Sequence, residues 1–205
     1  MSNFRLDHKL ALVTGCSRGI GMAIAIELAN AGADIIGVSN SMPQQGSEVA
    51  MAVEAAGRKF YPYAVDFSNR TALHDFIEKV KLDHPRIDIL INNASAINLT
   101  NTENTPAKRF DLMMGVNTRG TFLTSQACLP YLKKSAQEGR NPHILMLSPP
   151  LSMKGKWFKP HLAYTMAKYG MSMCVLGLAD ELKRDGIGVN ALWPRTAIDT
   201  AALAM

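Results

Sequence analysis

A tyrosine and a lysine four positions apart carry the clearest chemistry in this sequence. Tyr164 and Lys168 lie in a predicted helix over residues 162–184, so their side chains share one helix face and their heads can meet. A neighbouring ammonium favours the phenolate and lowers the pKa of a tyrosine from its usual value of about 10. A tyrosine tuned in this way can give a proton to a developing alkoxide near neutral pH. The pair alone is weak support, because the same spacing also arises by chance.

A glycine-rich stretch, LALVTGCSRGIG over residues 10–21, offers a place for a phosphate. An apolar run breaks at Gly15, and apolar residues resume at helical spacing from Ile20, which predicts a strand, a tight turn and a helix. Gly15, Gly19 and Gly21 allow a sharp turn and a close approach by the phosphate, which faces the free N–H groups of the helix. Three glycines can equally mark a bulge or a cap, but the flanking strand and helix supply the context of a dinucleotide site.

The elements that must position these residues alternate between strand and helix along the whole chain. Further strands are predicted at 33–39, 60–65, 87–91, 143–147 and 187–193, and further helical stretches at 43–57, 68–84 and 105–132. Wholly apolar strands joined by helices are typical of a parallel sheet that is covered on both faces. We therefore expect an α/β, doubly wound, Rossmann-type fold of six strands, with residues 1–205 as a single domain.

Ligands of such a sheet lie at the carboxyl ends of the strands, so the residues that follow each strand are candidates for the site. These candidates are Ser17, Arg18, Ser39, Asn40, Asp66, Asn93, Ser148 and residues 194–200. An acidic residue after the second strand would bind a ribose diol and repel a 2′-phosphate, but this chain has Ser39 and Asn40 there. With Arg18 nearby, we expect NADP as the cofactor, with NAD as the alternative. Asp66 has a second interpretation, as a turn-forming residue ahead of Ser68.

Composition argues against several other classes of function. The sequence has no apolar run near the roughly 18 residues that span a bilayer and no signal-peptide core at its start, so we expect no membrane association. The net charge of +5 comes from scattered Lys and Arg, which fits an anionic cofactor better than nucleic acid. Cys16, Cys128 and Cys174 lack metal-ligand spacing, so we expect reduced thiols in a cytoplasmic protein and no metal site.

Taken together, the motifs make the sequence similar to the short-chain dehydrogenase/reductase family over its whole length. They are Thr14-Gly15-x-x-x-Gly19-x-Gly21, Asp66, Asn92-Asn93-Ala94, Asn117, Tyr164-x-x-x-Lys168 and Pro194 with Ile198-x-Thr200. From Asn92 onward the chain resembles the hydroxysteroid dehydrogenase-like group, whereas the first ninety or so residues lean toward sugar-acid dehydrogenases. The resemblance implies an oxidoreductase that moves hydride between NADP and the carbonyl or secondary alcohol of a small molecule.

The resemblance also implies a role for each matching residue. Tyr164 would be the acid/base, Lys168 would lower its pKa and hold the nicotinamide ribose, and Asn117 would anchor a water relay to Lys168. The cofactor would be bound by Gly15, Ser17, Arg18, Gly19, Ile20, Gly21, Ser39, Asp66, Asn93, Ala94, Lys168, Ile198 and Thr200. Within that set, Asp66 would accept from the adenine amine, and Ile198 and Thr200 would hold the carboxamide and phosphate side.

Three features depart from the family pattern. Ser95 stands where the family has glycine, which narrows the room near the nicotinamide. Pro149 stands at the position of the substrate-polarising serine, so we expect Ser148 as the replacement, with Ser152 as the alternative, unless both are turn formers. The chain ends at Met205, before the family's substrate-covering segment and seventh strand.

The short C-terminus suggests a second candidate function, a truncated dinucleotide-binding module with little or no turnover. The long helices after the fourth and fifth strands are richer in apolar residues than one sheet-facing stripe needs. We therefore expect them to pair across a two-fold axis and to form a homodimer or a higher homo-oligomer.

Overall fold

The computed structural model describes residues 4–194 and residue 198. Six parallel strands form one sheet in the order β3-β2-β1-β4-β5-β6. The strands are β1 (Leu10–Thr14), β2 (Asp34–Ser39), β3 (Phe60–Ala64), β4 (Ile89–Asn92), β5 (His143–Leu147) and β6 (Gly188–Leu192). The order reverses between β1 and β4, which confirms the expected doubly wound α/β fold.

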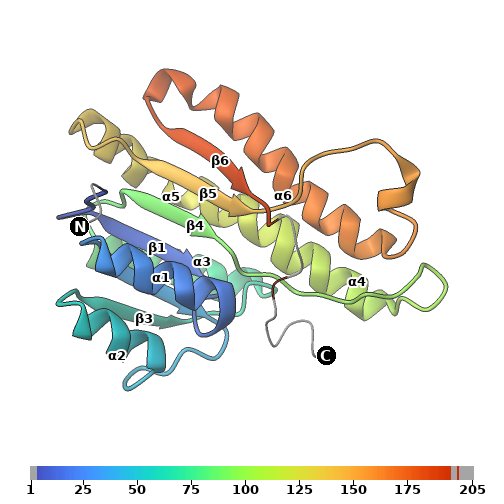
Figure 1. Ribbon diagram of the computed structural model, residues 1–205, viewed down its shortest axis with the longest axis horizontal. Helices are drawn as coiled ribbons and strands as arrows, with labels where there is room; N and C mark the ends of the chain where they lie inside the picture. The colour runs from blue at the N-terminus through green and yellow to red at the C-terminus, as the bar shows by residue number, and fades with distance from the viewer. Residues whose placement is uncertain (1–3, 195–197, 199–205) are drawn as a thin grey trace.

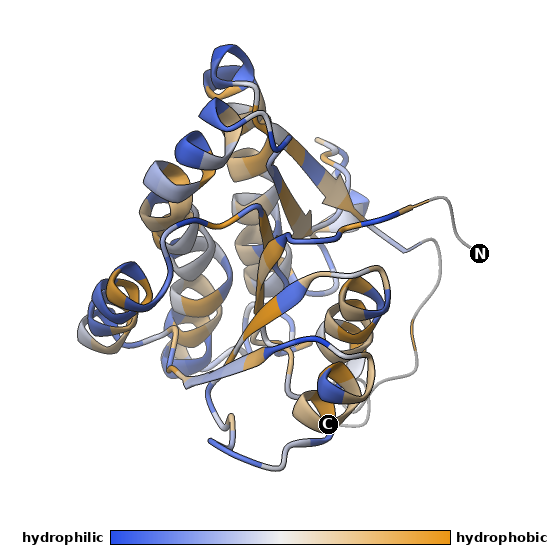
Figure 2. Ribbon diagram, turned by 90° about the vertical axis from the view of Figure 1, so that its left-hand side faces the viewer, coloured by the Kyte–Doolittle hydropathy of each residue, from blue (hydrophilic) through white to orange (hydrophobic). Residues whose placement is uncertain are grey.

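Helices lie on both faces of the sheet (Figure 1). The helices are α1 (Gly19–Asn30), α2 (Glu48–Ala55), α3 (Arg70–Asp83), α4 (Ala107–Met113), α5 (Thr121–Gln137) and α6 (Leu162–Glu181), with a π-helical segment η1 (Met114–Gly120) and single 3-10 turns η2 (Gly155–Trp157) and η3 (Lys183–Asp185). Helices α1 and α2 pack on one face, and α3, α5 and α6 pack on the other (Figure 2). No helix in the described part of the chain is long and apolar enough to cross a bilayer.

Alternation along β1 explains why this central strand is buried on both faces. In β1, Ala11 and Val13 point into the core beneath α1 and α2, while Leu12 points into the core beneath α3, α5 and α6. Successive side chains of a strand point to opposite faces, so a strand with a helix layer on each side must be apolar at every position. The continuous apolar runs in the sequence are the signature of this arrangement.

Capping side chains set the helix starts at places that periodicity alone did not predict. Helix α2 begins at Glu48, not near residue 43, because the Ser47 hydroxyl accepts a hydrogen bond from the Ala50 N–H at 3.2 Å. Helix α3 begins at Arg70 because the Asn69 side chain accepts from two backbone N–H groups of the first turn. The stretch expected as one helix over 105–132 is α4, η1 and α5 in succession and runs on to residue 137.

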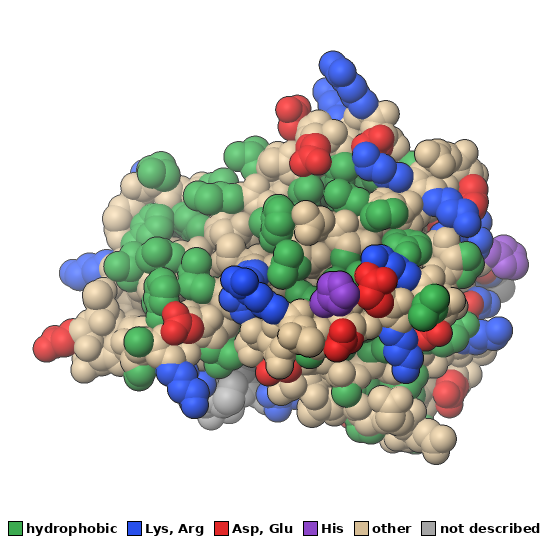
Figure 3. Space-filling view, turned by 180° about the vertical axis from the view of Figure 1, so that it is seen from behind, with side chains coloured by type: hydrophobic (Ala, Val, Ile, Leu, Met, Phe, Trp, Pro, Cys, Tyr) green, Lys and Arg blue, Asp and Glu red, His purple; other side chains and the backbone are tan. Residues whose placement is uncertain are grey.

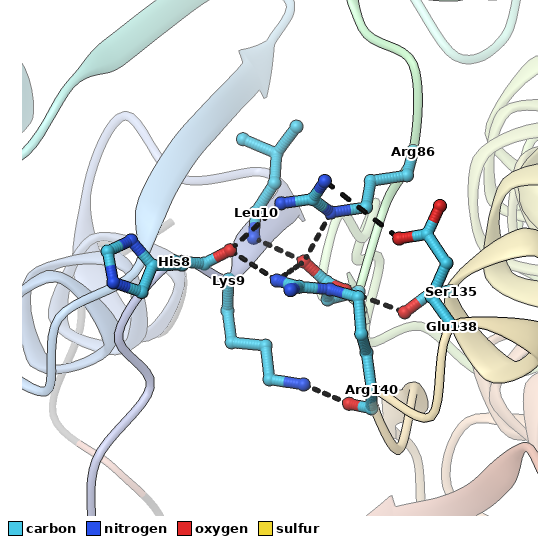
Figure 4. A network of polar contacts seen from close by, with 8 residues as sticks. His8, Lys9, Leu10, Arg86, Ser135, Glu138 and Arg140 are labelled. Atoms are coloured by element: carbon cyan, nitrogen blue, oxygen red, sulfur yellow. Dashed lines mark hydrogen bonds and ion pairs between the residues drawn. The ribbon is translucent and has the colours of Figure 1, made fainter.

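A buried carboxylate ties the strands together at the edge where they begin. Asp88 is fully buried ahead of β4, and it accepts hydrogen bonds from the Leu10 N–H at 2.8 Å, the Ser135 hydroxyl at 2.6 Å and the Arg140 Nε at 2.7 Å. Figure 4 shows these partners and Arg86 converging from different elements. Burial works to raise the pKa of Asp88, but the hydrogen bonds from Arg140, Ser135 and Leu10 outweigh it and hold the pKa below its usual 3.8.

Candidate active site

The turn between β1 and α1 has the shape that a phosphate requires. Gly15 adopts a φ of +68°, in the left-handed region that side chains disfavour, and its N–H donates to the Val38 carbonyl of β2 at 2.7 Å. Gly21 packs directly against the turn, so that a Cβ there would lie 2.8 Å from the Gly15 carbonyl carbon. The sequence prediction of a tight, closely packed turn at these glycines is confirmed.

The N-terminus of α1 is open toward this turn. Arg18 precedes the helix in an extended conformation, and its side chain makes no capping hydrogen bond. The first N–H groups of a helix carry a partial positive charge and are satisfied by a side chain, by water or by a ligand. Arg18 is exposed, and Ser17 and Ile20 are half-buried beside it. The three residues and the helix terminus together are suited to an anion.

Two side chains join the ends of β1 and β4 beneath the turn. The buried hydroxyl of Thr14 accepts hydrogen bonds from the backbone N–H groups of Asn93 and Ala94, each at 3.0 Å. In return, the Asn93 amide donates to the carbonyls of Thr14 at 2.9 Å and Gly15 at 3.0 Å. Asn93 therefore fixes the glycine turn, a structural task that the sequence motif did not reveal.

The ends of β2 and β3 carry the residues expected around the adenosine part of a dinucleotide. Ser39 is 6% exposed, and its hydroxyl is buried without a partner in the described part of the chain, while Asn40 is exposed. Asp66 accepts from the Ser68 N–H at 2.8 Å and from the Ser68 hydroxyl at 2.7 Å through one carboxylate oxygen. Asp66 thus forms the turn that its second interpretation predicted, and the residue is exposed.

Tyr164 and Lys168 lie one turn apart on α6, but the Lys168 ammonium has another partner in this structure. The Lys168 ammonium donates to the Leu147 carbonyl at the end of β5, and burial lowers the pKa of Lys168 to about 8. Burial raises the pKa of Tyr164, and the nearby Ser95 side chain lowers this pKa in part. The expectation that Lys168 depresses the Tyr164 pKa is therefore wrong for this geometry, because the ammonium is directed at a carbonyl and the phenol is desolvated.

Asn117 lies in η1, where the chain is wound more widely than in an α-helix. Its side chain is fully buried; the amide oxygen accepts from the Ala96 N–H at 2.7 Å, and the amide nitrogen donates to the Ala96 carbonyl at 2.9 Å. The neighbouring Thr118 hydroxyl donates to the Ala167 carbonyl of α6 at 3.0 Å. Segment η1 thus connects the loop after β4 with the helix that carries Tyr164.

The segment after β5 departs from the expected arrangement. Ser148 is 2% exposed, and its hydroxyl has no hydrogen-bond partner in the structurally described part of the chain. The Ser172 hydroxyl donates to the Pro149 carbonyl at 2.6 Å and anchors this segment on α6. In this conformation Ser148 faces the protein interior, so a contact with substrate requires the segment to move. Its catalytic role stays a prediction.

Two predicted site residues near the C-terminus are not placed in this cluster by any contact, and one cavity lies elsewhere in the described part of the chain. Ile198 is exposed, and Thr200 lies outside the described residues. A cavity of about 520 Å³ opens between α4 and the loop after β3, lined by Ser68, Lys108, Arg109, Asp111, Leu112 and Arg119. None of these lining residues belongs to the glycine turn or to α6, so this cavity is separate from the Tyr164 cluster.

Ser95 is the residue whose role at the site was missed from the sequence. It was noted only as a side chain that takes space near the nicotinamide, whereas in the structure it lies near enough to Tyr164 to lower the pKa of the phenol in part. The available signal was its position, since it follows β4 at the edge of the sheet where the other site residues gather.

Comparison with known proteins agrees with this geometry. Residues 9–204 match the family short chain dehydrogenase. The chain is 54% identical over 199 residues to hydroxysteroid dehydrogenase-like protein 2 of Bos taurus, a match that covers 94% of this chain and 46% of that protein. The chain thus spans about half the length of the curated relative it matches.

Solved structures share the whole arrangement of the described elements. A short-chain dehydrogenase of Mycobacterium thermoresistibile is 44% identical with a TM-score of 0.85, and the match covers 97% of this chain and 71% of that one. A metagenomic short-chain oxidoreductase in complex with NADP is 27% identical with a TM-score of 0.82, over 93% and 84% of the two chains. The NADH-dependent reductase A1-R′, complexed with NAD, is 26% identical with a TM-score of 0.82, over 94% and 80%.

Three observations lead to one conclusion. They are the uncapped helix after a glycine turn, the Tyr164 and Lys168 pair on α6 and the family match over residues 9–204. This chain belongs to the short-chain dehydrogenase family.

Proposed function

We propose that this protein is an oxidoreductase that uses a nicotinamide dinucleotide, with NADP preferred, to interconvert a carbonyl and a secondary alcohol on a small molecule. The observation that carries the proposal is the placement of Tyr164 on α6, which η1 and the Thr118–Ala167 hydrogen bond fix against the loop after β4. That loop is in turn bonded to the glycine turn through Thr14 and Asn93. A proton donor and a phosphate-binding turn therefore belong to one rigid assembly.

The residues at the carboxyl edge fit a dinucleotide. The open N-terminus of α1 is suited to the bridging phosphates, and we propose that the exposed Arg18 contacts the 2′-phosphate of NADP. The Ser39 hydroxyl, buried without a partner in the described part of the chain, would reach the adenosine ribose by turning outward. We propose that Gly15, Ser17, Gly19, Ile20, Gly21, Asp66, Asn93, Ala94, Lys168, Ile198 and Thr200 complete the binding site. When bound, the nicotinamide supplies or accepts the hydride.

The chain's own part in the reaction is a proton transfer at the Tyr164 oxygen. In the reducing direction a carbonyl carbon gains hydride, and Tyr164 gives its phenolic proton to the carbonyl oxygen, so that an alcohol and a phenolate result. Lys168, with its pKa lowered to about 8 by burial, lies one turn away and can stabilise that phenolate after leaving the Leu147 carbonyl. Asn117 holds the surrounding loop through Ala96.

Carbonyl-dependent oxidation of NADPH tests the proposal. Tyr164→Phe removes the proton and keeps the ring, so turnover is expected to fall by about 100-fold or more, the range for general acid catalysis. Tyr169→Phe is the matched control on the same helix. The Tyr169 ring packs edge-on against the ring of Phe158, with 4.9 Å between the ring centroids. Equal rates for wild type and Tyr164→Phe would remove Tyr164 from the mechanism.

A second candidate function is a module that binds the dinucleotide with little or no turnover. Two observations favour this function. The Lys168 ammonium is hydrogen-bonded to the Leu147 carbonyl and not to Tyr164, and Ser148 is buried. Measuring turnover in protein that demonstrably binds NADPH separates the two functions. Robust carbonyl reduction would exclude the second.

We also propose self-association through α5 and α6. Large apolar side chains on these helices are exposed, namely Phe122 at 48%, Met166 at 41%, Met173 at 61% and Leu176 at 67%. Viewed from the side of these helices, hydrophobic side chains gather over a broad area of the surface (Figure 3). A face of this kind is suited to an isologous homodimer. The free cysteines support our prediction of a cytoplasmic location.

A further inference from the structure

The cavity between α4, η1 and the loop after β3 has a strongly basic lining. Its volume of about 520 Å³ is within the range of small-molecule sites. Three of its lining residues are cations and one is a carboxylate, so two positive charges remain without a counter-charge in the lining. The lining residues are Ser68, Lys108, Arg109, Asp111, Leu112 and Arg119.

Helix α4 presents different faces to this cavity and to Tyr164. Phe110 and Met114 pack with Tyr164 in one apolar cluster. Lys108 and Leu112 line the cavity. Each pair is four positions apart and shares a helix face, and the two pairs are offset by two residues, which turns them by about 200° around the helix axis. The cavity is therefore separate from the Tyr164 site.

Arg119 is held at the wall of the cavity by its surroundings. Its Nη2 donates to the Ser68 carbonyl at 2.7 Å, which joins η1 to the loop after β3. Ser68 is itself fixed, because its N–H and its hydroxyl both donate to Asp66, at 2.8 and 2.7 Å. Gly115 leaves the room that the guanidinium fills, since a Cβ there would lie 3.0 Å from the same Nη2. The Arg119 guanidinium is therefore preorganised, and its other N–H donors make no hydrogen bond to a described residue.

The other charged side chains of the lining are not paired with each other. Lys108, Arg109 and Asp111 are exposed, and none of them makes an ion pair within residues 4–194. A phosphate monoester, with about two negative charges at neutral pH, matches the unbalanced charge, and a guanidinium can bind it through parallel N–H bonds. The cavity also has room for a carbon skeleton, which Leu112 and the apolar stems of the long cationic side chains can contact.

We propose that this cavity is a second anion-binding site, which takes the phosphate monoester of a small hydroxylated molecule such as a sugar alcohol. Arg119 binds the phosphate, and Lys108 and Arg109 complete the neutralisation of its charge. The Asp111 carboxylate accepts hydrogen bonds from hydroxyl groups of the ligand. A second copy of this chain is a poorer occupant, because it brings the same net charge of +5 and the same basic face. The inference does not depend on the proposed function.

Calorimetric titration with sorbitol 6-phosphate tests the site, with sorbitol as the uncharged counterpart. This phosphate ester has no carbonyl group, so it can neither react with lysine side chains nor be reduced. The titration is run in about 0.15 M KCl, which screens non-specific attraction between exposed charges. Wild type is expected to bind a single molecule of sorbitol 6-phosphate and no sorbitol. Arg119→Gln is expected to weaken the binding about tenfold or more, because it removes charge-assisted hydrogen bonds to the phosphate.

A double variant, Lys108→Gln with Arg109→Gln, keeps the test valid if the loss of Arg119 loosens the loop that it holds. Both side chains are exposed, so the substitutions leave the fold intact, and the affinity for sorbitol 6-phosphate is expected to fall about tenfold. Arg184→Gln is the matched control. Arg184 is also exposed, but it lies in η3 and outside the lining, so this variant is expected to keep the wild-type affinity.

Three results would overturn the inference. The first is the absence of saturable binding to wild type; if Arg119→Gln also loses self-association in light scattering, the cavity is filled by a second copy instead. The second is an unchanged affinity in both Arg119→Gln and the double variant. The third is competition with saturating NADPH, which would place the phosphate at the N-terminus of α1, whereas we expect NADPH to leave the affinity unchanged. The proposed function is decided separately, by the turnover of Tyr164→Phe.

Discussion

Replacing Asp88 by asparagine tests the carboxylate that joins the starts of the strands. The substitution keeps the shape of the side chain and one acceptor oxygen, but it removes the charge and places an NH₂ group opposite the Arg140 guanidinium. Asp88 is fully buried and accepts from Leu10, Ser135 and Arg140 at 2.6–2.8 Å. At least one of those donors loses its partner in the variant.

The expected decrease in the free energy of unfolding follows from the Arg140 guanidinium, which remains without its carboxylate partner. Breaking a buried ion pair from one side costs about 3–5 kcal/mol, because the remaining charge stays in the interior without compensation. Arg140 retains some solvent contact, with 22% of its side chain exposed, so the lower end of that range applies. We therefore expect Asp88→Asn to lower the free energy of unfolding by about 3 kcal/mol at neutral pH. Domains of this size have about 5–15 kcal/mol in total.

Urea unfolding followed by circular dichroism measures this loss, with Asp7→Asn as the control, because the pair of Asp7 with Arg5 is on the surface. The folded-state pKa of Asp88 lies below its usual 3.8, so the carboxylate stabilises the fold fully above that pH. Its contribution disappears as the pH falls through the lower folded value, and the deficit of the variant shrinks there. A decrease of less than about 1 kcal/mol in the free energy of unfolding at pH 7 would refute the reasoning. It would mean that the Asp88–Arg140 pair contributes no more stability than an ion pair on the surface.

Three further substitutions probe the cofactor site and the surface. Arg18→Ala is expected to weaken NADPH binding by about 1–3 kcal/mol and to leave NADH binding unchanged, as measured by fluorescence titration; equal losses for both would show that Arg18 does not read the 2′-phosphate. Gly21→Ala places a Cβ 2.8 Å from the Gly15 carbonyl carbon and should lower both the melting temperature and NADPH affinity, whereas Gly155→Ala, with nothing within 4 Å, should leave both near wild type. Leu176→Glu charges an apolar face of α6 and should shift light scattering toward monomer, while Leu82→Glu on α3 should not; a monomeric wild type would contradict the proposed dimer.

The layers of the fold could be predicted because each depends on a pattern that is local in sequence. Continuous apolar runs indicated strands buried on both faces, and all six strands lie within a few residues of the expected ranges. Helix starts were less predictable, since several polar residues compete to cap them. The helices expected from residues 43 and 68 instead begin after the caps Ser47 and Asn69, and the Ser68 side chain is already bonded to Asp66.

The candidate site was predictable in its members but not in their pairing. The carboxyl-edge rule identified Ser17, Arg18 and Asn93 as residues of one region. Which groups then meet depends on where long side chains turn, and that is decided by burial and by carbonyls distant in sequence. The Lys168 ammonium turns to the carbonyl of Leu147, 21 positions earlier in the chain, and not to Tyr164 on its own helix. Spacing along one helix carries no information on this contact.

The π-helical segment η1 has a consequence for how related sequences are aligned. A π turn holds an additional residue, and each residue of a helix turns the following side chains by about 100°. Residues of α4 and α5 therefore do not continue one regular helical stripe across Met114–Gly120, and a hydrophobic pattern extended from one side is out of phase on the other. Loss of one residue within this segment would straighten the helix and turn Asn117 away from Ala96. If an alignment of related sequences placed a gap in this segment on the basis of regular helical periodicity, it would assign Asn117 to the wrong face of the helix. The residues on both sides of the segment would still be aligned correctly.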